Sequence, residues 1–258
     1  MVAVPYRPAP SPTVADAIAD VSTISGYFEL GVGPIEPGWR PLTDLPVEQR
    51  IADVAERLGT GETRVAASIL FQGLAARLWS PAVGAAVAHG LLVDLAPARL
   101  HWYPAAGGPL PLRAERPTGW HVADAEDVQQ MAEPLYRTVV SGLLEPLARA
   151  VQEVVRIAPG LLWGNAASSL AGAVRAIARG RPGLAARAAA LGRELLEMGV
   201  LRGTGDLVEP APGQPFFVRR SCCLYYRVPG GGMCEDCVLI DQETRRAQWE
   251  TAMRVTRG

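Results

Sequence analysis

Four cysteines near the C-terminus are the residues of this chain best suited to chemistry. Cys222, Cys223, Cys234 and Cys237 follow the pattern C-C-x10-C-x2-C, and they are the only cysteines among the 258 residues. Cysteine thiolates are strong ligands for zinc and iron, and four that converge can hold one metal ion or one iron–sulfur cluster. The grouping therefore predicts a metal centre in this segment.

Disulfide bonds are the competing interpretation of these cysteines. The sequence shows no signal peptide, so we expect a reducing compartment in which disulfides are rare. A domain of this size can also form its core without covalent links. The adjacent Cys222 and Cys223 would pair only with strain, because neighbouring side chains diverge in an extended segment. Metal binding is the favoured interpretation.

The spacing of the cysteines distinguishes between kinds of metal centre. Zinc sites with four cysteines usually contain two C-x2-4-C knuckles, and here only Cys234 and Cys237 form one. The adjacent Cys222 and Cys223 would chelate a single ion with difficulty, whereas a two-iron cluster spreads its four ligands over a longer unit. Three successive glycines at 230–232 allow positive φ and close approach of the backbone, so that N–H groups can donate to sulfur. The pattern favours a two-iron cluster, while zinc remains open.

This cysteine pattern resembles the signature of the FhuF-like ferric-siderophore reductases. The resemblance implies a [2Fe–2S] cluster on all four cysteines, and the neighbouring Arg219, Arg220 and the R-x-P-G-G stretch from Arg227 also match. Residues 70–95 resemble the middle helical region of the family, and residues 161–177 resemble its Trp-Gly-Asn helix. Within that helix we interpret Asn165 as a cap or turn former, and Gly164 as a position where the backbone can pack close to the cysteine loop.

The resemblance implies a ferric-siderophore reductase that passes one electron to siderophore-bound Fe(III), with a hydroxamate type of siderophore expected. Fe(III) matches anionic oxygen donors better than Fe(II), so reduction loosens the chelate and releases Fe(II). This chemistry needs no catalytic residue beyond the cluster. The sequence contains no Rossmann or flavin motif, so an external donor such as a ferredoxin or a flavin reductase is expected. An iron–sulfur electron carrier or sensor, and a zinc-clipped siderophore-binding protein without redox activity, remain alternatives.

Three arginines beside the cysteines are candidates for a supporting role. Arg219, Arg220 and Arg227 can compensate the negative charge of four thiolates, or they can contact the substrate or an acidic electron donor. We favour charge compensation, with Arg220 as the first candidate because it lies two residues before Cys222. The three histidines of the chain show no ligand spacing, so we expect no role for them at the metal centre.

Composition excludes several other functions. The formal net charge is −1, which implies neither a nucleic acid nor an anionic membrane as partner. The chain contains no lysine, which excludes a lysine nucleophile and a P-loop. No apolar run reaches the roughly 18 to 20 residues that a transmembrane helix needs. We therefore expect a soluble, cytoplasmic protein.

Helical periodicity dominates the sequence, and the expected fold class is mainly α with a small β element, followed by a C-terminal iron–sulfur loop and a helix. We expect a first region over residues 1–123, with helices and the β element, and a second helical region over 124–258 that ends in the cluster-binding segment 219–240. The expected β signals are a hairpin near 98–116, a strand near 27–30 and a short strand over 215–218. Residues 1–12 are expected to be disordered or extended. The expected helices cover residues 14–21, 46–58, 62–79, 81–95, 124–157 (divided by Pro134 and Pro146), 162–179, 183–198 and 241–255.

Overall fold

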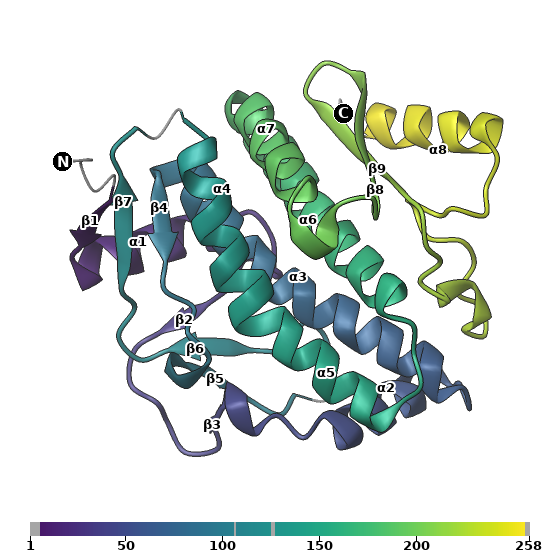
Figure 1. The fold of residues 1–258 in the computed structure, drawn as a ribbon, viewed down its shortest axis with the longest axis horizontal. Coiled ribbons are helices and arrows are strands. Elements are labelled where there is room, and N and C mark those ends of the chain that lie inside the picture. Colours follow the sequence, from purple (N-terminus) through teal and green to yellow (C-terminus); the bar gives the residue numbers. More distant parts are fainter. Residues whose placement is uncertain (1–5, 106, 125–126, 256–258) are drawn as a thin grey trace.

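The computed structural model describes residues 6–105, 107–124 and 127–255 of the chain. These residues form a mainly helical fold with three small β-sheets, so the predicted fold class is confirmed (Figure 1). At the N-terminal end, residues 1–5 lie outside the described residues, residues 6–9 form a strand, and the first helix already begins at Ser11.

The α-helices are α1 (Ser11–Ser22), α2 (Val47–Leu58), α3 (Thr63–His89), α4 (Gln129–Leu135), α5 (Glu145–Val154), α6 (Pro159–Gly180), α7 (Ala185–Leu196) and α8 (Gln242–Val255). A π-helical segment, Tyr136–Leu144, joins α4 to α5, and short 3-10 turns cover Leu42–Asp44, Pro97–Arg99, Pro182–Leu184, Gly199–Leu201 and Tyr225–Arg227. The strands are β1 (Tyr6–Ala9), β2 (Gly31–Val32), β3 (Arg40–Pro41), β4 (Leu91–Val93), β5 (Leu100–Trp102), β6 (Leu112–Ala114), β7 (Gly119–Val122), β8 (Gly205–Ala211) and β9 (Gln214–Arg219).

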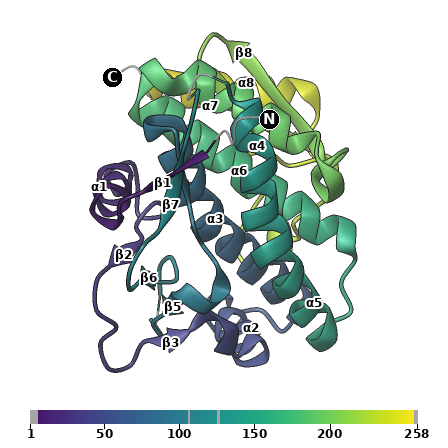
Figure 2. The same ribbon diagram turned by 60° about the vertical axis from the view of Figure 1, so that its left-hand side comes forward.

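Helices α3 and α6 form the centre of the molecule and pack against each other. Helix α3 also packs against α1 and α2, and α6 against α7 and β9, so the two helices share one hydrophobic core with both halves of the chain (Figure 2). The division of the chain near residue 123 stays a prediction. Within the described residues, none of the helices combines the length and the apolar character that crossing a bilayer requires.

The predicted helix break at Pro81 is wrong. Helix α3 continues through Pro81 to His89 and ends where Gly90 adopts a left-handed φ of 59°. Proline removes one backbone N–H donor and usually interrupts a helix. Here residues 77–87 are all buried, and their packing keeps the segment helical.

The remaining helix predictions agree more closely with the structure. The prolines expected to divide or kink residues 124–157 do not interrupt the helical course, which is continuous from Gln129 to Val154; Pro134 and Pro146 lie next to the changes from α- to π-helix and back. The π-helical segment between them was not predicted. The predicted terminal helix, which corresponds to α8, is confirmed.

Three small sheets complete the fold. Their strand orders are β1-β7-β4, β2-β6-β5-β3 and β8-β9, and all neighbouring strands are antiparallel except β2 and β6. The predicted hairpin near 98–116 is confirmed by β5 and β6, which pair Leu100 with Ala114 and Trp102 with Leu112. The strand predicted near 27–30 is wrong, because these residues form an irregular loop that buries Phe28.

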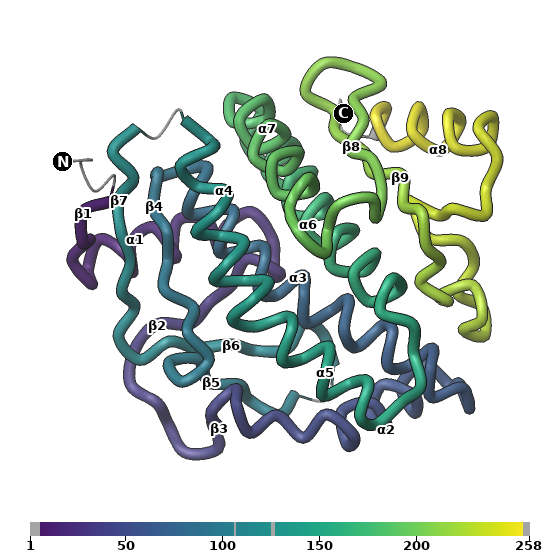
Figure 3. Tube along the Cα trace, in the orientation of Figure 1, coloured from purple at the N-terminus to yellow at the C-terminus, as the bar shows by residue number. Residues whose placement is uncertain are grey.

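The C-terminal segment forms a separate layer against α6. The β8–β9 hairpin leads through an irregular loop, residues 220–241, to α8, and the chain can be followed along this course in Figure 3. The strand predicted over 215–218 lies within β9. Helix α8 is fixed to the hairpin by Trp249, whose ring lies 5.0 Å from the ring of Phe216. The four cysteines all lie in the loop between β9 and α8.

Candidate metal centre

The cysteine loop holds its four thiols at different depths. Cys223 and Cys237 are buried, whereas Cys222 and Cys234 are partly exposed. The Sγ atoms of Cys223 and Cys234 lie 3.5 Å apart, too far for a disulfide bond. An ion about 2.3 Å from two sulfurs in tetrahedral geometry would hold those sulfurs about 3.8 Å apart. The separation of Cys223 and Cys234 is therefore close to that of two ligands of one metal ion.

Backbone N–H groups already donate to three of the cysteine sulfurs. The N–H of Leu224 lies 3.4 Å from Sγ of Cys222, and the N–H of Leu239 lies 3.4 Å from Sγ of Cys237. A third such bond joins the N–H of Tyr225 to Cys223. Each donor is two residues after its cysteine, and such bonds stabilise negative charge on sulfur.

The loop reaches this geometry through unusual backbone angles. Among the described non-glycine residues, Leu224 alone has a positive φ, 67°, immediately after the vicinal cysteines. Gly230 and Gly232 have φ of 73° and 70°, and a Cβ on Gly231 would lie 2.7 Å from the carbonyl oxygen of Tyr225. The glycines thus allow the positive φ and the close approach that the sequence predicted. A left-handed non-glycine residue costs free energy and is typical of functional loops.

The thiols of Cys223 and Cys234 are joined by a hydrogen bond. The pKa of Cys223 is lowered to about 6, mainly by this hydrogen bond with Cys234. The same bond raises the pKa of Cys234, and burial adds to that rise. Burial is also the largest cause that raises the pKa of Cys222. A bound metal would take the place of these protons, because thiolates and not thiols are the ligands.

The donor set fits a two-iron cluster better than a single ion. Within the residues that the structure describes, no three His, Cys, Asp or Glu side chains are grouped to hold one metal ion. A structural zinc ion needs four ligands around one point, whereas each iron of a [2Fe–2S] unit takes two cysteines. The paired Cys223 and Cys234, together with Cys222 and Cys237, whose sulfurs each accept a backbone N–H, are compatible with the second arrangement.

The three candidate arginines lie in different environments. Arg219 is buried, and its charge acts on Cys222, Cys223 and Cys234. Arg220 is exposed and forms an ion pair with Asp206 at 3.1 Å, and Arg227 is exposed and pairs with Glu62 at 2.8 Å. The geometry thus favours Arg219, and not Arg220, for charge compensation.

A buried polar network connects Arg219 to the two central helices. Its Nη2 donates to Oδ1 of Asn165 on α6 at 2.6 Å, and its Nε donates to the carbonyl oxygen of Ser221. Asn165 in turn donates to Ser68 on α3, whose hydroxyl donates to the carbonyl oxygen of Cys223 at 2.6 Å. The interpretation of Asn165 as a cap is therefore wrong, because this residue lies fully buried inside α6.

Gly164 permits the contact between α6 and the cysteine loop. A Cβ at this position would lie 2.0 Å from Oγ of Ser221 and 3.4 Å from Nη2 of Arg219. The loop could not approach α6 as closely with any larger residue there. The expectation that Gly164 lets the backbone pack close to the cysteine loop is confirmed.

The C-x2-C knuckle is also fixed from outside the loop. Glu235 forms an ion pair with Arg175 of α6, and the Arg175 guanidinium lies 4.1 Å from the centre of the Phe216 ring. On the other side, Nη2 of Arg245 on α8 donates to the carbonyl oxygen of Cys237 at 2.9 Å. The knuckle is thus held between α6 and α8.

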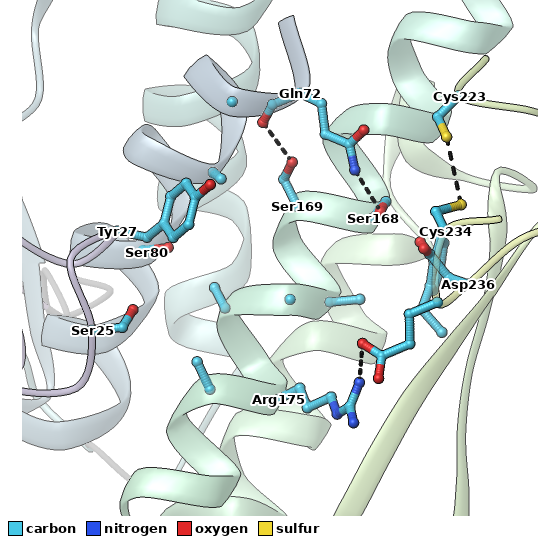
Figure 4. A pocket seen from close by; sticks show the side chains of 18 of the residues that line it. Ser25, Tyr27, Gln72, Ser80, Ser168, Ser169, Arg175, Cys223, Cys234 and Asp236 are labelled. Atoms are coloured by element: carbon cyan, nitrogen blue, oxygen red, sulfur yellow. Dashed lines mark hydrogen bonds and ion pairs between the residues drawn. The ribbon is translucent and has the colours of Figure 1, made fainter. Parts of the chain in front are cut away.

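A pocket of about 480 Å³ opens directly beside the Cys223–Cys234 pair. Figure 4 shows these two cysteines on one side of the pocket, Tyr27 and Ser80 on the other, and Arg175 between them at the bottom of the view. Helices α3 and α6 contribute mostly small or polar residues to the walls, together with Ile69, and aromatic side chains complete them: Tyr27, Phe28, Phe216, Phe217 and Tyr225. The volume lies within the roughly 300–1,000 Å³ range of small-molecule sites.

The far end of the pocket is shaped by a buried arginine. Arg77 of α3 donates to the carbonyl oxygens of Gly26 and Tyr27 at 2.7 Å each, and also to those of Glu29 and Leu110. Burial lowers the pKa of Arg77 to about 10 despite the favourable charge of Glu29. The residue fixes the 26–29 loop, which carries the exposed Tyr27 into the pocket wall.

The histidines lie away from this centre, and none of them lines the pocket. Nε2 of His89 lies 2.7 Å from the carboxylate of Asp20, at the end of α3. His101 and His121 lie on β5 and β7. No signal in the sequence identified the pocket, because its residues are distributed over five separate segments.

The comparison with known families agrees with this geometry. A family model described as the FhuF 2Fe-2S C-terminal domain matches residues 219–239, which contain all four cysteines. Among curated proteins, none matches the chain. The match bears out the resemblance noted in the sequence, and the cofactor of this region is a [2Fe–2S] cluster. Residues 219–239 of this chain are thus similar to the FhuF 2Fe-2S C-terminal domain.

Proposed function

We propose that this protein is a ferric-siderophore reductase. Four cysteines ligate its [2Fe–2S] cluster: Cys222, Cys223, Cys234 and Cys237. When bound, the [2Fe–2S] cluster supplies one electron to siderophore-bound Fe(III), which is released as Fe(II) because Fe(II) binds anionic oxygen donors less well. The electron is replaced by an external donor such as a ferredoxin or a flavin reductase, and we place the reaction in the cytoplasm.

The observation that carries this proposal is the pocket that reaches the Cys223–Cys234 pair. A ferric siderophore is bulky and cannot enter a packed core, so it needs an open site next to the electron source. The pocket meets this need, because two cysteines line one end of it and α3, α6 and several aromatic side chains line the rest. These residues bind and orient the chelate, and no protein acid or base is required.

The charges at the pocket support a chelate of the hydroxamate type. Arg175 is the cation among the lining residues and pairs with Glu235, and the same wall also carries the carboxylate of Asp236. Three hydroxamates balance the charge of Fe(III), whereas three catecholates give a chelate of charge −3. A neutral or cationic chelate therefore meets less repulsion from this wall and from the thiolates behind it.

The two alternatives are less well supported. An electron carrier or sensor needs an accessible cluster, but it does not need a pocket of this size beside two of the ligands. A zinc clip needs four thiolates around one ion, and the described cysteines are not grouped in this way. The family match likewise indicates iron and sulfide and not zinc.

Steady-state reduction with two kinds of chelate tests the proposal. The holoprotein is supplied with electrons by a low-potential chemical reductant, and released Fe(II) is trapped by a ferrous-specific chromogenic chelator. We expect turnover with a neutral ferric tris-hydroxamate and at least about tenfold less with a ferric tris-catecholate. The proposal would be contradicted if the protein released Fe(II) from both chelates no faster than the reductant alone does.

A further inference from the structure

Arg219 is a buried cation, and the groups that accept hydrogen bonds from its side chain within the described residues are neutral. Its side chain is 1% exposed, and its hydrogen bonds go to the carbonyl oxygen of Ser221 and the amide oxygen of Asn165. Within the described residues, its Nη1 is buried without a hydrogen-bond partner. Burying a charge that has no partner of opposite charge is unfavourable, because the ion loses its hydration and gains no attraction in return. The nearby cysteine thiolates are the groups that can compensate it.

The orientation of Asn165 is fixed by its own donors. Its Nδ2 lies 2.9 Å from the carbonyl oxygen of Ser68 and 2.8 Å from the Ser68 hydroxyl. A carbonyl oxygen accepts only, so the amide nitrogen must face Ser68 and the amide oxygen must face Arg219. Asn165 can therefore bind the guanidinium in one orientation only.

Ser68 closes the network into a ring. Because Ser68 accepts from Asn165, its hydroxyl hydrogen is free to donate to the carbonyl oxygen of Cys223 at 2.6 Å. Every bond then runs in the same sense, from Arg219 through Asn165 and Ser68 to Cys223, and aligned bonds polarise one another. The second bond of Arg219, to Ser221, returns to the same loop two residues before Cys223.

We propose that Asn165 and Ser68 are positioning residues that hold the Arg219 guanidinium beside the cluster and thereby raise its reduction potential. Neither residue needs to touch iron or a cysteine sulfur to do so. A fixed positive charge favours the reduced state of the cluster, which carries one more negative charge than the oxidised state. The inference rests on the cysteine ligation proposed above, and it adds a role for two residues from α3 and α6.

Redox titration of the loaded protein, followed by EPR, tests this role in three variants. Asn165→Leu removes both the donor and the acceptor at similar volume, Asn165→Asp places a carboxylate against Arg219, and Ser68→Ala removes the link to Cys223. We expect a downward shift of the potential in all three, smallest for Ser68→Ala because Arg219 keeps its partner there. If Asn165→Leu does not fold, Asn165→Asp and Ser68→Ala still test the proposal, and a wild-type potential in both would contradict it.

A double-mutant cycle separates positioning from a general loss of packing. If Asn165 acts through Arg219, then Asn165→Leu should shift the potential in the wild-type background and not in an Arg219→Gln background. Equal shifts in both backgrounds would overturn the proposal. So would a loaded Asn165→Leu variant with the wild-type potential.

Ser169→Ala is the matched control for these variants. Ser169 is also buried on α6 and also bonds across to α3, where its hydroxyl donates to the carbonyl oxygen of Gln72 at 2.9 Å, but it has no recorded bond to the cysteine loop. We expect the reduction potential of the cluster in Ser169→Ala to equal that in the wild type. A shift as large as that of Asn165→Leu would show that any cross-helix bond matters and would overturn the specific role. Absence of a cluster in the wild type would instead contradict the proposed function, so the two failures are distinguishable.

Discussion

The Sγ atoms of Cys223 and Cys234 lie 3.5 Å apart at the wall of a pocket between α3 and α6. The two residues come from opposite halves of the C-C-x10-C-x2-C pattern, so the loop between them folds back to pair them. Cys222 and Cys237 do not line this pocket. Two of the four cysteines thus face the pocket, and the other two do not.

Replacement of any one cysteine by serine should remove the cluster and the reductase activity. The helical core does not depend on the loop, because α3 and α6 pack directly against each other. We therefore expect the far-ultraviolet circular dichroism of Cys222→Ser, Cys223→Ser, Cys234→Ser and Cys237→Ser to retain most of the wild-type helical signal. Global unfolding of Cys234→Ser would indicate a structural metal instead.

Filling the pocket should reduce turnover without a change at the cluster. A Cβ on Gly172 of α6 would meet no atom within 4 Å, so Gly172→Leu projects into the pocket without a clash. We expect kcat/KM for a ferric hydroxamate to fall by about tenfold or more, on the scale of steric discrimination in pockets. The reduction potential should stay at the wild-type value.

Gly160→Leu provides the control on the same helix. Gly160 is exposed at the start of α6, has open space around its Cβ position and does not line the pocket. Its kcat/KM should match that of the wild type. Full activity of Gly172→Leu, or an equal loss in Gly160→Leu, would show that the chelate binds elsewhere.

Among the three arginines, Arg219 should have the largest effect on the potential. Arg219→Gln removes a buried positive charge, and we expect the potential to fall by roughly 60 mV, which for one electron is about tenfold in the equilibrium constant. Arg220→Gln and Arg227→Gln should produce smaller shifts, because solvent screens these exposed charges and Asp206 and Glu62 already pair with them. Redox titration of the three variants tests this order. A larger shift for Arg220→Gln than for Arg219→Gln would contradict it.

The ion pair that fixes α1 should make stability depend on acid pH. Arg181 lowers the pKa of Asp20 through a 2.6 Å hydrogen bond, and His89 adds to this effect. Because the folded-state pKa lies below the unfolded value, the contribution is present above about pH 4 and is lost as the pH falls through the folded-state pKa. The free energy of unfolding of the wild type should exceed that of Asp20→Asn near pH 6, and the difference should shrink toward pH 3. A difference that is constant over this range would exclude the carboxylate as its source.

Much of the fold could be predicted from local sequence. The helical periods and the glycine turn between β5 and β6 act over a few residues, and the structure follows them. Pro81 is the exception, because its local preference is overridden by the burial of the segment around it. Tertiary packing of this kind has no local signal.

The site could be predicted only where its residues are close in sequence. The four cysteines lie within one loop, and their spacing in the sequence is enough to predict a metal centre. Asn165 and Ser68 lie on different helices, far from the cysteines in sequence, and their contacts exist only after α3 and α6 have packed. The Trp-Gly-Asn resemblance was the one signal that pointed to Asn165. Arg219 and Arg220 are adjacent, and only tertiary packing separates them: Arg219, the last residue of β9, is buried against Asn165 of α6, whereas Arg220 is exposed and pairs with Asp206.

A single-turnover experiment tests the central claim most directly. The purified protein, shown to contain about two irons and two acid-labile sulfides per chain, is reduced anaerobically, freed of reductant and mixed with a stoichiometric ferric tris-hydroxamate. We predict that the EPR signal of the reduced cluster disappears as about one Fe(II) per cluster is released to a ferrous chelator. A reduced signal that persists while the chelate remains ferric, or stoichiometric zinc without sulfide in the purified protein, would contradict the account.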